Sequence, residues 1–251
     1  MRPIARSQHA ARVIDPSEPS VPTCQEHPMQ IDFWFTMGST YSYLSVMRLH
    51  ERKSNITFRW RPFHLLIILQ EMNHVPFADK PAKMTYMWRD VARRAEMYGI
   101  PARLPAPYPA RQSIAANLVA LVGMQEGWGV DFVCAAYRNW FQRGEETGSE
   151  PNLSHSLQEV GQDPKRVLAL AGSENARSLL MKETDEAKRL GIFGSPTFVV
   201  GRELFWGDDR LEDAIAWAHR HQNAGQGVKD ENGNDVARIH PPGAGQPPSR
   251  E

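Results

Sequence analysis

At 251 residues, the chain can form one large domain or two small ones, and either would bury a sizeable core. Lys plus Arg and Asp plus Glu number 29 each, so no excess charge points to nucleic acid or an anionic membrane as a partner. Hydrophobic residues make up 41%, which is typical of a soluble globular protein, and no apolar run approaches the roughly 20 residues of a membrane span.

The two cysteines, Cys24 and Cys134, form no motif, so we expect no disulfide framework and a reducing, cytoplasmic compartment. Apolar neighbours predict that Cys134 is buried. Residues 1–28 lack an apolar signal core, and 222–251 are rich in Gly, Pro and Asn. We predict that both ends are flexible, with an organellar transit peptide as the alternative for the first.

The folded part opens with two alternating segments that flank a helical one. Polar and aromatic residues alternate in 30–36 (QIDFWFT) and again in 55–61 (NITFRWR), which predicts two strands. Between them, 42–52 carries apolar residues at helical spacing. A β-α-β connection of this kind is right-handed, so the two strands should be parallel.

The segment 63–190 carries only helical patterns. Apolar residues recur at helical spacing in 81–98, 111–126 and 130–141. Ser156 with Glu159 predicts a capping box for a short helix. Ser173 is the expected N-cap of the last helix in this segment, and Gly191 suits the left-handed position after its end.

Two short strands, 197–200 and 203–206, are predicted next, and Asp208 opens a final helix. The order β-α-β, helices, β-β-α predicts an α/β fold with a thioredoxin-like core and a large all-helical insertion. The predicted units are a thioredoxin-like domain (29–62 and 191–221) and a helical insertion domain (63–190).

Three segments should meet at one place in such a fold, and the first is the turn after the first strand. Thioredoxins hold a Cys-x-x-Cys pair there, whereas this chain has Ser39 and Ser42 at that spacing. Helix amino-terminal amides stabilise an anion at this point, which suits a thiolate supplied from outside. The alternative is a plain helix cap, since serine favours that position.

The second segment contains the Ser195-Pro196 bond, at the start of a predicted strand. This is where a thioredoxin fold keeps its cis proline. We expect the amide and carbonyl of Ser195 to be unpaired and to face the first turn, where an extended peptide could pair like an added strand. The alternative is an ordinary trans proline at the start of an edge strand.

The third segment is the helix start at Asp208 and Asp209. One or both carboxylates are candidates to bind the ammonium group of a γ-glutamyl moiety. The alternative is that they cap the helix and complement its dipole.

Four pieces of the chain, DFWFTMGSTYSYL, RWRPFHLL, GIFGSPTFVV and LFWGDDRLED, resemble the 2-hydroxychromene-2-carboxylate isomerase family, which is related to kappa-class glutathione transferases. The likeness covers about 30–220. It implies a DsbA-like thioredoxin fold with a helical insertion, glutathione as cofactor and a homodimer. The family's turn reads Ser-Pro-Tyr-Ser, whereas this chain has Thr40 in place of the proline.

The resemblance also implies roles for individual residues. Ser39 occupies the place of the serine that contacts the glutathione sulfur. The other implied glutathione contacts are Asn73, Lys83, Ser195, Pro196, Asp208 and Asp209. Met72 precedes Asn73 where the family has glycine.

The activity that the resemblance implies is a glutathione-dependent isomerisation of an aromatic-catabolism intermediate by reversible thiolate addition. One alternative is a kappa-class-like transferase, which shares the first half of that mechanism. Others are DsbA-like thiol–disulfide exchange, which the missing Cys-x-x-Cys argues against, and a glutathione-binding protein without catalysis. The expected partner is an aromatic or otherwise electrophilic small molecule, with no nucleic acid and no membrane.

A few further side chains have simple interpretations. His64 and His74 have no Cys or acid at metal-ligand spacing, so no metal is expected. Arg93 and Arg94 are interpreted as a solvated helix face. Trp88, Trp128, Trp140 and Phe141 are expected mainly in the core, while some of this set, with Tyr86, are candidates to line an aromatic site.

Overall fold

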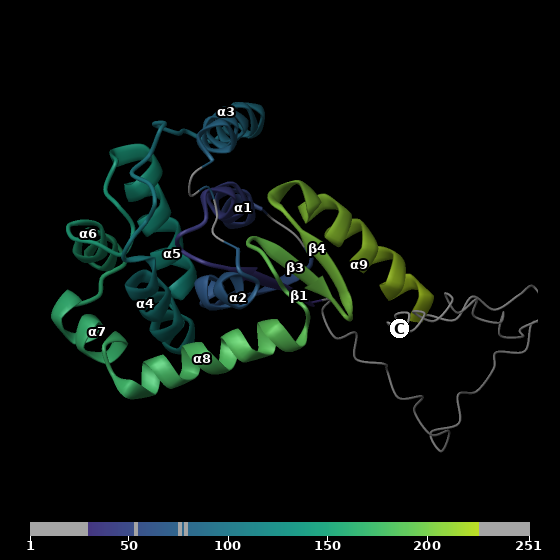
Figure 1. Cartoon of the computed structure of the whole chain (residues 1–251). Coiled ribbons are helices and arrows are strands. Elements are labelled where there is room, and N and C mark those ends of the chain that lie inside the picture. Colours follow the sequence, from purple (N-terminus) through teal and green to yellow (C-terminus); the bar gives the residue numbers. More distant parts are fainter. Residues whose placement is uncertain (1–29, 53–54, 75–76, 78–79, 226–251) are drawn as a thin grey trace, which may run out of the picture.

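The computed structural model describes residues 30–52, 55–74, 77 and 80–225 (Figure 1). The end predicted to be flexible at 1–28 lies outside the described residues. So does 226–251, while residues 222–225 of the predicted tail belong to the last helix, which continues to Gly225.

The strands form a mixed sheet in the order β2-β1-β3-β4. β1 (Gln30–Phe35) pairs in parallel with β2 (Thr57–Pro62) on one side. On its other side it pairs antiparallel with β3 (Thr197–Val200), which in turn pairs antiparallel with β4 (Glu203–Trp206). The predicted thioredoxin-like arrangement of strands is confirmed.

Helices separate and follow these strands. They are α1 (Thr40–Glu51), α2 (Leu65–Glu71), α3 (Pro81–Tyr98), α4 (Ser113–Glu126), α5 (Gly129–Arg138), α6 (Asn152–Glu159), α7 (Pro164–Ala171), α8 (Glu174–Arg189) and α9 (Leu211–Gly225). A π-helical turn, Asn139–Arg143, extends α5, and a 3₁₀ turn, Asp208–Arg210, precedes α9. Figure 1 shows α9 alongside β3 and β4, with α4 to α7 gathered at the opposite end of the molecule.

The alternation of β1 places its side chains on two faces of the sheet. Ile31, Phe33 and Phe35 are fully buried in a large cluster with residues of α1, α9 and the inserted helices. Trp34 points the other way and, with Val199, packs in a smaller cluster against α2 and α8. β1 is therefore buried on both faces, which fixes the position of the turn at its carboxyl end.

Two helices in the insertion differ from the predicted pattern. α6 begins at Asn152 after Pro151, so the predicted capping box is wrong, and Ser156 is buried inside the helix, where Asn139 donates to its hydroxyl at 2.9 Å. α7 was not predicted, although Asp163 caps it by accepting from two backbone amides. The predicted N-cap at Ser173 is confirmed, because its hydroxyl accepts from the Ala176 amide at 3.2 Å.

The large cluster contains buried residues from the sheet and from the helices between β2 and β3. The two regions share this core, so the division into two domains stays a prediction. Within the described part of the chain, none of the helices combines the length and the apolar character needed to cross a bilayer.

Candidate active site

The turn between β1 and α1 carries Ser39 as the N-cap of α1. Its backbone is extended, and its hydroxyl accepts from the Ser42 amide at 3.2 Å. The same hydroxyl donates to the Ser195 carbonyl at 3.0 Å. Behind it, the Ser42 hydroxyl lies 2.9 Å from the Ser195 hydroxyl, which also accepts from the Thr36 amide at 3.0 Å. The first two predicted segments are therefore in direct contact.

The Ser195-Pro196 bond is cis, as predicted. The prediction that the Ser195 carbonyl is unpaired is wrong, because the Ser39 hydroxyl reaches across and occupies it. The Ser195 amide donates to no group among the described residues. The Pro196 carbonyl accepts from Gly207 at 2.9 Å, which ties the third predicted segment to the other two.

Buried polar side chains of the inserted helices hold this turn from behind. Asn117 on α4 accepts from the Met37 amide at 2.8 Å and donates to the Thr36 hydroxyl at 2.9 Å. It also donates to the Phe63 carbonyl at the end of β2 at 3.3 Å. Tyr137 on α5 donates to the Thr36 carbonyl at 2.9 Å. The insertion is thus part of the structure that positions Ser39.

A cavity of about 660 Å³ opens in front of Ser39 and Ser195, a size that suits a small-molecule ligand. Its apolar and aromatic wall consists of Tyr41, Leu65, Leu66, Leu69, Met72, Phe77, Tyr86, Met87, Tyr108, Pro109, Ala110, Phe193 and Trp206. Tyr86 is 60% exposed and Trp206 55%, so part of this wall is a hydrophobic rim open to solvent. The predicted place of Tyr86 agrees with the structure.

Trp206 at the end of β4 is held tightly at this rim. Its ring packs edge-on against Phe193 with centroids 4.8 Å apart. Beneath it lies the buried Gly194, where an added Cβ would be 2.2 Å from the indole nitrogen. Only glycine fits at this position without a shift of the indole ring.

The structure places the two predicted insertion residues differently. Lys83 lines the cavity, and its ammonium lies 5.5 Å from the centre of the Phe77 ring. Asn73 is exposed, adopts a left-handed backbone with φ of 51°, and does not line the cavity, although its neighbours Met72 and His74 do.

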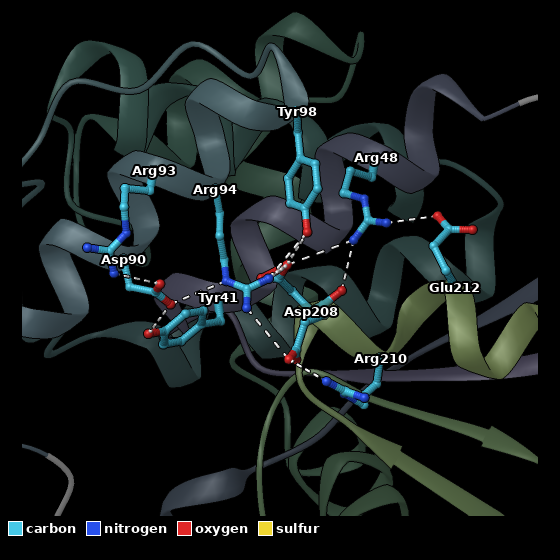
Figure 2. Close-up of polar contacts among 10 residues, drawn as sticks. Tyr41, Arg48, Asp90, Arg93, Arg94, Tyr98, Asp208, Arg210 and Glu212 are labelled. Carbon is cyan, nitrogen blue, oxygen red and sulfur yellow. Dashed lines mark hydrogen bonds and ion pairs between the residues drawn. The ribbon is translucent and has the colours of Figure 1, made fainter.

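Asp208 is buried and does not line the cavity. Figure 2 shows Arg48, Arg94 and Tyr98 converging on it from α1 and α3. Tyr98 donates to its Oδ2 at 3.2 Å and Arg94 at 3.4 Å, while Arg48 donates to its carbonyl at 2.8 Å. Its Oδ1 has no hydrogen-bond partner among the residues that the structure describes. Asp208 therefore anchors the start of the last helix to α1 and α3.

Asp209 is the more accessible of the two acids, with 37% of its side chain exposed. It pairs with Arg210 at 2.9 Å and with Arg94 at 3.6 Å. Partial burial raises the pKa of Asp209, but the hydrogen bond and charge of Arg210, with the charge of Arg94, lower it overall. Asp209 is thus a carboxylate, near the site but outside the cavity wall.

Arg94 is not a solvated residue, which corrects the prediction for the Arg93-Arg94 pair. Its side chain is 22% exposed and also bonds Asp90 at 3.2 Å. Asp90 in turn accepts from Tyr41, a cavity residue, at 3.0 Å. Burial, followed by the charge of Asp90, raises the pKa of Tyr41, so this phenol stays protonated. The sequence offered no signal for this network, because its members come from three distant segments.

Burial raises the pKa of Asp208 to about 6, although Arg94 and Arg48 oppose this rise. At pH values between the ordinary carboxyl pKa and about 6, Asp208 is protonated in the folded protein but ionised in the unfolded chain. Its contribution to the free energy of unfolding therefore decreases as the pH rises through this range. We expect the stability of the wild type relative to Asp208→Asn to fall by about 2 to 3 kcal/mol between pH 4 and pH 7. Urea unfolding at several pH values measures this difference. A difference that grows with pH would show instead that the arginines dominate.

The described residues contain no group of three or more His, Cys, Asp and Glu side chains placed to hold a metal ion. Cys134 is buried, as predicted, and burial raises the pKa of its thiol to about 12. A cysteine in this state does not serve as a nucleophile.

Known proteins resemble this chain over the region that forms the site. The DSBA-like thioredoxin domain family matches residues 30–215. A 2-hydroxychromene-2-carboxylate isomerase of Sphingobium xenophagum is 27% identical over 186 residues, which cover 72% of this chain and 94% of that one. Glutathione S-transferase kappa 1 of Caenorhabditis elegans is 26% identical over 197 residues, with 72% and 87% covered.

A solved 2-hydroxychromene-2-carboxylate isomerase structure superposes with a TM-score of 0.70 at 25% identity, covering 79% of this chain and 99% of that chain. The family match spans most of the chain and includes all four strands, the cis Ser195-Pro196 bond and the turn at Ser39. The chain therefore belongs to the DsbA-like thioredoxin domain family.

Proposed function

We propose that the protein is a glutathione-dependent isomerase of the 2-hydroxychromene-2-carboxylate type. The observation that carries this proposal is the Ser39 hydroxyl, which caps α1 beside Ser195 on the wall of a cavity lined by apolar and aromatic residues. The names of the isomerase and kappa-class relatives support the same chemistry.

In this proposal, α1 and Ser39 together stabilise the thiolate of bound glutathione. A free thiol with a pKa near 8.5 is only a few per cent ionised at pH 7, so the site must lower that pKa. The amino end of α1 has no acidic residue in its first turn, which leaves its dipole free to favour an anion. A hydrogen bond from the Ser39 hydroxyl adds to this effect.

Glutathione binding would also free the Ser39 proton. In the present structure that proton is directed at the Ser195 carbonyl. A cysteinyl amide that pairs with this carbonyl, in the manner of an added strand, takes over the acceptor. Ser39 can then donate to the sulfur, while the Ser195 amide donates to a carbonyl of the tripeptide. Pro196 contributes by setting the direction of the Ser195 backbone.

The remaining proposed contacts concern the charged ends of glutathione. Lys83 lines the cavity and would bind a carboxylate, with Asn73 next to its rim. Asp209 is exposed and ionised, so it would bind the γ-glutamyl ammonium. Asp208 would act through its position, by fixing the turn that presents Asp209.

The thiolate would add reversibly to a conjugated carbon of an aromatic-catabolism intermediate. A bond rotation and elimination then restore the thiol, so glutathione acts as a cofactor. A free thiol of this kind suits a reducing, cytoplasmic compartment. The homodimer implied by the resemblance stays a prediction.

A transferase of the kappa class is the second candidate, and the kappa-class relatives favour it. The two activities differ in whether the adduct is eliminated or released. Incubation with glutathione and either a hydroxychromene carboxylate or a halogenated aromatic distinguishes them by product. Thiol–disulfide exchange is disfavoured because Ser39 and Ser42 replace the two redox cysteines.

We expect calorimetric titration to detect glutathione binding below about 1 mM, weak enough for a cofactor drawn from a cellular pool. Ophthalmic acid, in which a methyl group replaces the thiol, is the matched ligand and should bind with similar affinity but support no turnover. No heat with either ligand up to several millimolar would reject glutathione as the cofactor.

A further inference from the structure

The amino end of α4 forms part of the cavity wall, next to the turn that carries Ser39. Arg111 and Ser113 both line the cavity. An added Cβ on Gly38 would lie 2.9 Å from the Ser113 hydroxyl oxygen, which shows how closely α4 approaches this turn. These residues take no part in the glutathione contacts proposed above.

Ser113 is a buried polar residue at this end of the cavity. It is 5% exposed, and its hydroxyl makes no hydrogen bond with any other described residue. Its hydroxyl oxygen is not fully buried, so it is reached from the cavity, and a polar side chain with this little exposure normally has a hydrogen-bond partner. Since Ser113 faces the cavity, a ligand is the group that would supply the partner.

The electrostatics of this end of the cavity favour an anion. α4 has 14 residues, no side chain caps its amino end, and its first turn contains no acid. The Arg111 side chain forms no hydrogen bond or ion pair with another described residue. Glu146 accepts from the Arg111 backbone amide at 2.7 Å but does not line the cavity. No Asp or Glu is found among the described residues of the cavity wall.

We propose that the amino end of α4 is a carboxylate-binding subsite, in which the Arg111 guanidinium and the Ser113 hydroxyl hold the anionic end of a ligand bound in the cavity. A guanidinium pairs with a planar carboxylate through two parallel hydrogen bonds, and the helix dipole adds to this attraction. The aromatic wall would hold the apolar part of the same ligand.

This inference builds on the proposed function, because the carboxylate would belong to glutathione or to the molecule that reacts with it. Cinnamate is a suitable probe for the second source, and cinnamamide has the same shape without the charge. Glutathione and its glycine amide form the equivalent pair for the first source. The full chain is titrated with each of the four ligands separately, so the cinnamate arm does not require glutathione to bind.

In one of the two pairs, we expect Arg111→Gln to weaken binding of the acid (cinnamate or glutathione) by about tenfold. Ser113→Ala should weaken binding of the same acid by about threefold. The uncharged member of that pair should change by less than about twofold in both variants. Arg89→Gln, which changes an exposed arginine on α3 outside the cavity, should leave all four affinities unchanged. A loss confined to cinnamate assigns the carboxylate to the reacting molecule, and one confined to glutathione assigns it to the cofactor.

The subsite is rejected if Arg111→Gln weakens acid and amide equally in both pairs, or weakens neither, or if no ligand binds the wild type. If the protein binds cinnamate more tightly than cinnamamide but does not bind glutathione, the subsite is supported and the proposed cofactor is rejected. Thermal unfolding of each variant shows whether the fold is intact. Ser113→Ala removes one oxygen atom and creates no steric conflict with Gly38, so it tests the subsite independently of Arg111.

Discussion

Replacing Ser39 by alanine is expected to lower turnover about 100-fold, while glutathione affinity changes by less than about threefold. The hydroxyl donates to a negatively charged sulfur, and such a bond is worth more in the reacting thiolate than in the bound thiol. Steady-state kinetics give the turnover. The thiolate absorbance near 240 nm, followed against pH, gives the pKa of the bound thiol, which should rise in the variant.

The same substitution also removes the cap of α1, and Ser39→Gly separates the two effects. Alanine at an N-cap costs about 1 kcal/mol, whereas glycine costs only a few tenths. Both variants lack the hydroxyl, so both should lose turnover to the same extent, and only the alanine variant should be clearly less stable. Unchanged turnover in Ser39→Gly would exclude the proposed role of the hydroxyl.

Replacing Asn117 by leucine is expected to lower the free energy of unfolding by about 3 kcal/mol. The side chain has nearly the same shape but makes none of the three hydrogen bonds of the amide. The Met37 amide and the Phe63 carbonyl are then left without these partners at the buried end of β1 and β2. Urea unfolding followed by circular dichroism measures the loss.

Asn152→Leu is the matched control, because Asn152 is equally buried and donates to two carbonyls, those of Ala136 at 3.0 Å and Glu145 at 2.9 Å. It should be destabilised to a similar degree. Turnover per folded molecule should fall only in the Asn117 variant, since only that residue holds the Ser39 turn. An equal fall in both would show that the activity follows general stability.

The strand order was predictable because each strand has a strong local signal and the topology rules leave few alternatives. The contact between Ser39 and Ser195 follows from the same reasoning, since both lie where strands of a thioredoxin-like sheet meet a helix. The hydrogen bond from the Ser39 hydroxyl to the Ser195 carbonyl does not follow from it, because the direction of a hydroxyl proton depends on which acceptor lies nearby in the folded protein. The sequence pattern alone therefore predicts a free Ser195 carbonyl.

Asp208 shows a more general limit of sequence reasoning. Its position at a helix start is visible in the sequence, but Arg48 and Arg94, which determine its environment, come from two other helices. A local motif cannot distinguish an acid that faces a ligand from one that anchors the fold. The sequence does not mark Arg111 as a site residue for a related reason. An arginine before a helix can be assigned to a site only when the cavity beside it is known.

The contact between Gly194 and Trp206 has a consequence for altering substrate range. The indole lies against the Phe193 ring and over a backbone that has no side chain, so a side chain added at 194 would have to displace it. The shape of the entrance is therefore determined by the two positions together. Libraries that vary 194 alone would be dominated by steric failures, whereas a smaller residue at 206 makes room for diversity at 194. The two positions should be randomised as a pair.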